Sequence, residues 1–132
     1  MPELAGISHI DLTVTDRDRS ERFYVAVLGF EVVKRVDKPH FRLTDMKHPG
    51  LDVEMCVRQP VAGDRSRFDE LRTGLDHLSF RVTSRAELER WQNHLEEHGV
   101  TCTPTVATSY GAVLVFRDPD NIQLELMSDP GT

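Results

Sequence analysis

The chain contains two copies of a similar short sequence motif. HIDLTV begins at His9, and HLSFRV begins at His77 in the second half of the chain. Each phrase is a histidine followed by alternating apolar and polar residues, the pattern of a strand with one buried face. Each is followed by a polar turn and then by a charged stretch with helical spacing. A phrase that recurs together with its surroundings indicates an internal repeat, and this repeat limits the possible folds more than any other feature.

The repeat predicts the same run of elements in both halves: a strand, a helix and three more strands. Asp16 and Ser84 are good N-caps for the two helices, and Gly29 and Gly99 suit the position after a helix. The predicted elements cover residues about 7–15, 17–28, 30–36, 40–46 and 50–58, and again about 75–83, 85–98, 100–108, 110–117 and 121–128.

We therefore predict a single α+β domain over residues 1–132, built from two βαβββ modules. Module one covers about 7–58 and module two about 74–128. The segment between them, about 59–73, is charged and contains proline and glycine, so it is predicted to be a linker.

Four polar side chains fall on strand faces that point away from the predicted helices. His9 and His77 alternate with apolar residues in the first strand of each half, and Glu54 and Glu125 do so in the last strand. The apolar residues must face the helices, so these four side chains face the other way. The repeat thus supplies one histidine and one glutamate in each half, at matching positions.

Two imidazoles and one or two carboxylates on a concave sheet are a suitable donor set for a divalent metal. The set His9, Glu54, His77 and Glu125 suits Ni, Co, Zn, Mn or Fe(II) and leaves coordination positions open for water or substrate. A single histidine on a strand is more often a surface or core residue than a ligand. Because four residues agree in type, face and repeat position, we predict one divalent metal per site.

Composition excludes several other classes of partner. The net charge is −6 and the basic residues are scattered among acidic ones, which argues against nucleic acid. No apolar run approaches the roughly 20 residues of a membrane helix, and the N-terminus has no secretory signal pattern. Cys56 and Cys102 form no disulfide or metal motif, so we expect reduced thiols and a cytoplasmic location.

The chain resembles the vicinal oxygen chelate superfamily, which includes glyoxalases, bleomycin resistance proteins and extradiol dioxygenases. The resemblance runs from Ile7 to Met127. It is carried by HIDLTVTD at the start, FYVAVLGF from Phe23, GLDHLSFRV from Gly74 and FRDPDNIQLEL from Phe116. It implies that the two modules form an open, curved mixed sheet around a cavity, with the helices outside.

The resemblance also implies a site. In glyoxalase I and its relatives the metal ligands come from the first and last strands of each module, and the matching positions here are His9, Glu54, His77 and Glu125. In fosfomycin resistance enzymes, two histidines and one glutamate match His9, His77 and Glu125. Substrates of the superfamily chelate the metal through adjacent oxygens, and the metal stabilises the developing oxyanion. Glu54 and Glu125 are then the candidate catalytic residues, available to move a proton beside a carbonyl.

Three functions stay open on this basis. A glyoxalase-like lyase or isomerase is favoured, acting on a small-molecule substrate such as a thiol adduct. Glyoxalase I normally grips the carboxylates of glutathione, and Arg42, Arg58 and Arg81 are candidates here, although strand arginines are as often simply exposed. An extradiol Fe(II) dioxygenase is an alternative, but such enzymes usually carry a tyrosine where this chain has Val115.

A non-catalytic protein that binds a drug or metabolite is the third possibility. Bleomycin resistance proteins keep the fold but usually lack the histidines and glutamates that are intact here. The resemblance further implies a homodimer, because modules this short commonly pair across chains. In that arrangement His9 and Glu54 face the partner's His77 and the partner's Glu125.

Overall fold

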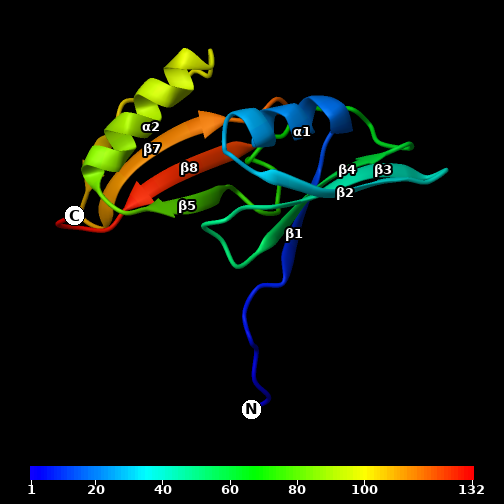
Figure 1. Cartoon of the computed structure of the whole chain (residues 1–132), viewed down its shortest axis with the longest axis horizontal. Coiled ribbons are helices and arrows are strands. Elements are labelled where there is room, and N and C mark those ends of the chain that lie inside the picture. Colours follow the sequence, from blue (N-terminus) through cyan, green and yellow to red (C-terminus); the bar gives the residue numbers. More distant parts are fainter. The chain divides into compact units, whose positions relative to one another are not determined.

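The structure is a computed structural model that describes all 132 residues. The chain forms two helices and eight strands, most of which are labelled in Figure 1. The elements are β1 (His9–Thr13), α1 (Arg17–Ala26), β2 (Glu31–Asp37), β3 (Phe41–Lys47), β4 (Glu54–Pro60), β5 (Leu78–Val82), α2 (Arg85–Glu97), β6 (Val106–Thr108), β7 (Gly111–Arg117) and β8 (Gln123–Ser128). The predicted order of elements in each half is confirmed. Neither helix is long and apolar enough to cross a membrane.

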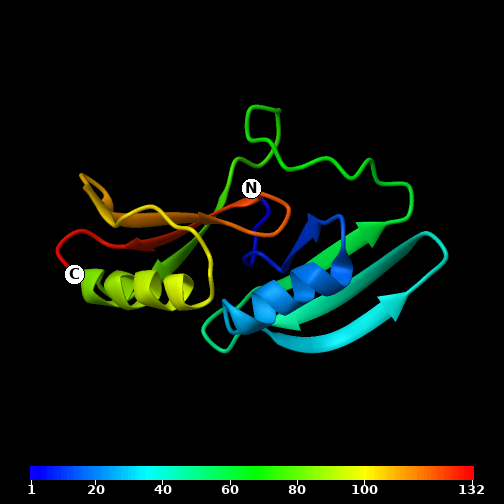
Figure 2. The same cartoon turned by 90° about the horizontal axis from the view of Figure 1, so that it is seen from above.

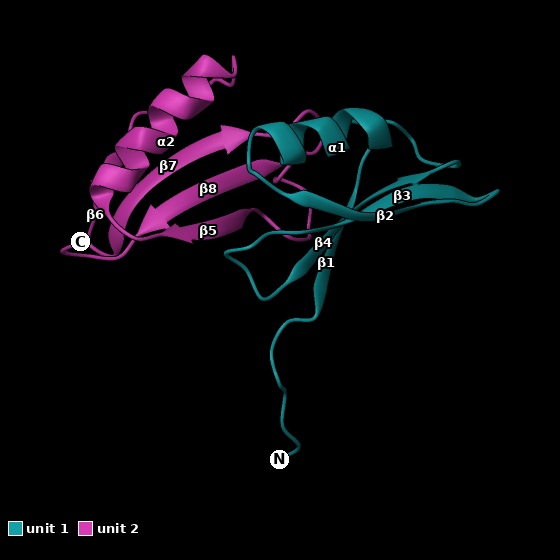
Figure 3. Ribbon diagram, in the orientation of Figure 1, with its two compact units in different colours: residues 1–66 teal, residues 67–132 magenta.

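The chain divides into unit 1, Met1–Ser66, and unit 2, Arg67–Thr132, coloured separately in Figure 3. Each unit has a four-stranded mixed sheet, in the order β1-β4-β3-β2 or β5-β8-β7-β6. In each sheet the first and last strands of the module pair in parallel, and the other neighbours are antiparallel. The two units therefore share one topology, and the predicted α+β architecture of two βαβββ modules is confirmed.

In unit 1, helix α1 packs on β3 and β4. The Asp16 side chain caps the helix by accepting a hydrogen bond from the Arg19 N–H. Tyr24 on α1 is fully buried, as are Met46 on β3 and Val57 on β4. One face of this sheet therefore packs against α1 and forms the core of the unit.

In unit 2, helix α2 packs along β5, β7 and β8, as Figure 2 shows from above. Ser84 caps it by accepting from the Glu87 N–H. Leu88 and Leu95, at helical spacing, are fully buried, and so is Leu124 on β8. The opposite face of this sheet carries the polar residues of β5 and β8.

Most of the predicted strands are shorter in the structure, including β1 and β5. β4 begins at Glu54 rather than at residue 50, because residues 48–51 form a turn. In this turn the Gly50 N–H donates to the His48 side chain and the Leu51 N–H donates to the His48 carbonyl. The strand predicted over 100–108 contributes only β6 and a single bridge at Cys102. Pro104 interrupts it, since proline has no N–H to donate to the neighbouring strand.

Candidate metal centre

The first half of the predicted site lies on the exposed face of the unit 1 sheet. His9 at the start of β1 and Glu54 at the start of β4 are partners in the parallel register. Both are exposed, whereas Leu12 on β1 and Val57 on β4 are buried on the other side. The strand alternation thus places one imidazole and one carboxylate level with each other on neighbouring strands.

These two side chains line a groove of about 320 Å³. Its lining residues come from all four strands of the unit: His9, Asp11, Lys34, Val36, Leu43, Asp45, Glu54, Met55, Cys56 and Arg58. Apart from the histidine, the charged side chains are three carboxylates and two cations. The groove therefore has a net negative charge, which favours a bound cation.

Most of the charges in the groove are paired. The Arg58 guanidinium donates to Asp11 at 3.2 Å and lies over the Phe41 ring at 4.5 Å from its centroid. The Lys34 ammonium is 3.4 Å from an Asp45 carboxylate oxygen. Glu54 is the exception, because its side chain makes no hydrogen bond or ion pair in the structure. It is the carboxylate in the groove that is left available to a ligand or a proton.

Cys56 lies at the base of the groove and is only 3% exposed. Burial, assisted by the negative charge of Asp11 and a hydrogen bond with Asp45, raises the pKa of the Cys56 thiol to about 12. The thiolate is the reactive form of cysteine, so Cys56 is not equipped to act as a nucleophile at neutral pH.

Native Cys56 should therefore react very slowly with thiol reagents. In a Cys102→Ser variant, which leaves Cys56 as the only thiol, we expect labelling by a disulfide reagent at pH 8 to be at least about 100-fold slower than in urea. The Cys56→Ser variant is the matched control, since it reports the half-buried Cys102 instead. Rapid labelling of native Cys56 would show that the groove activates the thiol.

The second half of the predicted site lies in unit 2. His77 immediately precedes β5, and its Nδ1 is 2.6 Å from the Asp76 carboxylate. Glu125 lies on β8 opposite Ser79 of β5, whose hydroxyl donates to it at 2.8 Å. Leu124 and Leu126, on either side of Glu125, are buried. The predicted faces of these strands are therefore confirmed.

The registers of the two units differ by two residues. In unit 1 the histidine is level with the glutamate, whereas in unit 2 Glu125 is level with Ser79, two residues beyond His77. No group of three or more histidine, cysteine or acidic side chains comes together closely enough to hold a metal. Each unit therefore presents one histidine and one glutamate, and the four-residue ligand set stays a prediction.

The donor chemistry of these residues fits a divalent metal. Both histidines have Nδ1 engaged by the preceding side chain: Ser8 Oγ lies 3.0 Å from His9 Nδ1, and Asp76 lies 2.6 Å from His77 Nδ1. This arrangement leaves Nε2 available to a metal, and histidine ligands are usually held through their other nitrogen in this way.

Among the residues of the groove that sequence reasoning missed are Lys34 and Asp45, which form an ion pair. Asp45 interrupts a strand in which Leu43, Thr44 and Met46 are buried, and it is the register partner of Cys56. An acidic residue within an otherwise apolar and buried strand could have indicated that its side chain lines a groove. Lys34 follows a bulge in β2, where the register shifts between Val32 and Lys34, so simple alternation does not place it.

The fold and the exposed polar faces define a class: proteins built from two βαβββ modules, each presenting a histidine and a glutamate on its open sheet face. A family model also matches nearly the whole chain. The chain belongs to the Glyoxalase/Bleomycin resistance protein/Dioxygenase superfamily, whose model matches residues 6–126.

Individual relatives agree with the family assignment. A glyoxylase/bleomycin resistance protein/dioxygenase domain from Frankia sp. EAN1pec has a crystal structure that is 38% identical in sequence, with a TM-score of 0.89. The match covers 96% of this chain and 99% of that one. YwkD of Bacillus subtilis is 32% identical, over 93% of this chain and 96% of YwkD. Catechol-2,3-dioxygenase of Bacillus subtilis is 30% identical, over 93% of this chain and 41% of that enzyme.

Proposed function

We propose that this chain is a metal-dependent enzyme in which His9, His77 and Glu125 hold one divalent ion and Glu54 is a fourth ligand or the base. One observation carries the proposal. His9 and Glu54 are level with each other on neighbouring strands, they line a groove with net negative charge, and the Glu54 carboxylate makes no hydrogen bond or ion pair. A structural role would not require an exposed imidazole and an unpaired carboxylate side by side. Cytoplasmic location and small-molecule substrates belong to the same proposal.

The bound ion would polarise adjacent oxygens of a chelating substrate and stabilise negative charge on them. Glu54 would accept the proton beside the polarised carbonyl, because no hydrogen-bond donor in the protein competes for its oxygens. Glu125 suits the ligand role better, since Ser79 already donates to it and fixes its orientation. Arg58, held by Asp11 and Phe41, would orient an anionic part of the substrate.

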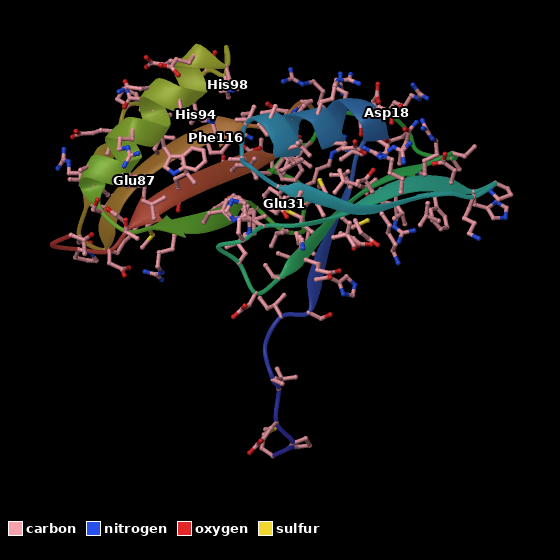
Figure 4. The ribbon with its side chains drawn as sticks, in the orientation of Figure 1. Asp18, Glu31, Glu87, His94, His98 and Phe116 are labelled. Carbon is pink, nitrogen blue, oxygen red and sulfur yellow. The ribbon has the colours of Figure 1, made fainter.

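A lyase or isomerase of the glyoxalase type uses these groups most directly. With Ni²⁺ or Zn²⁺ we expect the protein to isomerise the adduct of methylglyoxal and a thiol. Glu54→Gln should lower kcat by about 10²–10⁴-fold, the usual contribution of a positioned base. Glu31→Gln is the matched control: Glu31 is an exposed carboxylate on β2, labelled in Figure 4, and does not line the groove. Equal loss in both variants would argue against a role for Glu54 as the base.

Ring cleavage by an Fe(II) dioxygenase is the second candidate, favoured by the 30% identity to catechol-2,3-dioxygenase. Val115 on β7, where such enzymes usually carry a tyrosine, counts against it. Oxygen consumption with a catechol and Fe(II), together with no turnover of the thiol adduct, would reverse the order of the two candidates.

A further inference from the structure

The His77 imidazole lies at one end of a series of polar contacts, all of which are within unit 2. Asp76 Oδ1 is 2.6 Å from His77 Nδ1, and the Gln123 amide nitrogen donates to the same oxygen at 3.5 Å. The Gln123 amide oxygen accepts from Arg117 Nη2 at 2.9 Å. Arg117 is clamped by both oxygens of Glu70, at 2.9 and 2.8 Å. These contacts thus connect Glu70, in the segment before β5, to the predicted ligand His77.

The strongest link in this series is the one furthest from His77. The hydrogen bond from Arg117 lowers the pKa of Glu70 to about 2, so the pair stays charged at neutral pH. The pKa of Arg117 is raised, first by its hydrogen bond to Glu70 and more weakly by the charge of Asp76. A bidentate pair between a guanidinium and a carboxylate has a fixed geometry. Arg117 is therefore a firm support for the residues nearer the histidine.

This support fixes the orientation of the Gln123 amide. Arg117 has only donors, so it must face the amide oxygen of Gln123. The amide nitrogen then faces Asp76, and an N–H beside a carboxylate oxygen is the favourable arrangement. The network itself therefore assigns the two ends of the amide.

Asp76 in turn fixes the tautomer of His77. An ionised carboxylate has no proton to give, so the Nδ1 of His77 must carry the hydrogen and donate it. The lone pair of the neutral ring is then on Nε2. His9 lacks this constraint, because the Ser8 hydroxyl beside its Nδ1 either donates or accepts. The two repeated histidines differ in this respect.

We propose that Asp76 is a positioning residue that holds His77 as the Nδ1–H tautomer with Nε2 ready for a metal, and that Gln123 and Arg117 hold Asp76 in place. The proposal rests on the proposed metal-dependent function, with His77 as a ligand. It assigns the two halves of the site different roles: His77 is preset for binding, and His9 adjusts when the ion arrives. Partners behind ligating histidines typically contribute 10–100-fold to metal affinity.

The first test reads the tautomer in metal-free protein. Nitrogen-15 NMR at pH about 9, where imidazoles are neutral, distinguishes a protonated from an unprotonated ring nitrogen. We expect wild-type His77 to carry its proton on Nδ1, and Asp76→Ala to shift the population toward Nε2–H. Asp76→Asn keeps an acceptor oxygen without the charge and should give an intermediate population. An unchanged tautomer in Asp76→Ala would overturn the proposal.

The second test measures Zn²⁺ affinity by competition with a chromophoric chelator. We expect the Kd to rise about 10–100-fold in Asp76→Ala, with a smaller rise in Asp76→Asn and in Ser8→Ala. Gln123→Leu should also weaken binding, because it disconnects Asp76 from Arg117. Asp64→Ala removes an exposed aspartate from unit 1 and should leave the Kd unchanged. Circular dichroism confirms that each variant is folded.

The outcomes separate this proposal from the proposed function. Wild-type binding of Zn²⁺ with equal affinity in Asp76→Ala would overturn the positioning role and leave the metal site standing. No binding of Zn²⁺, Ni²⁺ or Fe²⁺ by the wild-type protein would overturn both.

Discussion

His77→Ala protein should retain no stoichiometric divalent metal after loading and desalting, whereas the wild-type protein should retain one ion per site. His77 is the histidine whose Nδ1 is held by a carboxylate, so its loss removes a preset ligand and leaves only one imidazole in the proposed set. Elemental analysis by mass spectrometry, after incubation with Ni²⁺ or Zn²⁺, gives the stoichiometry directly.

His40→Ala is the control for this measurement. His40 is an exposed histidine in the turn between β2 and β3 and has no place in the proposed site. Its metal content should equal that of the wild-type protein. Equal content in wild type and His77→Ala would remove His77 from the ligand set and, with it, the present form of the metal site.

A mixture of two inactive variants, His9→Ala and His77→Ala, should regain activity. We propose that the protein is a two-fold homodimer, in which His9 and Glu54 of one chain complete a site with the partner's His77 and the partner's Glu125. Two-fold dimers are the commonest oligomers, and their symmetry creates two equivalent sites. A mixed dimer would then have one site with both lesions and one site with neither.

With equal amounts and free subunit exchange, about half of the dimers are mixed and activity should reach about a quarter of the wild-type value. Exchange is verified separately with subunits that carry different tags. A control mixture of His77→Ala with Glu125→Ala should stay inactive, because each site of a mixed dimer then carries one of the two lesions and no site is intact. A monomer in sedimentation, or no recovery despite exchange, would show that each chain builds its own site.

The sequence predicted the faces of the strands well, because a period of two residues is a local property. Leu12 and Leu124 are buried and His9 is exposed, as the alternation indicates. The helix N-caps at Asp16 and Ser84 were also predictable, since capping depends on one side chain and the next three residues. Both rules use information within a few residues along the chain.

The groove and the support of His77 were not predictable in this way, since both depend on contacts between distant parts of the chain. Asp45 lies beside Cys56 only because of the register between β3 and β4, which the turn over residues 48–51 sets. Glu70 reaches Arg117 across 47 residues of sequence. Charged residues in a segment predicted as a linker gave no sign that one of them holds a strand residue in place.

A register difference of two residues between the units preserves the sheet face on which each side chain lies. A strand that slips by one residue turns every side chain to the opposite face, and Glu125 would enter the core. A slip of two residues keeps every side chain on its own face and changes only which neighbour lies opposite. The difference of two residues therefore leaves both glutamates on the open face of their sheets, and it places Ser79 beside Glu125 while the Glu54 side chain has no hydrogen-bond partner.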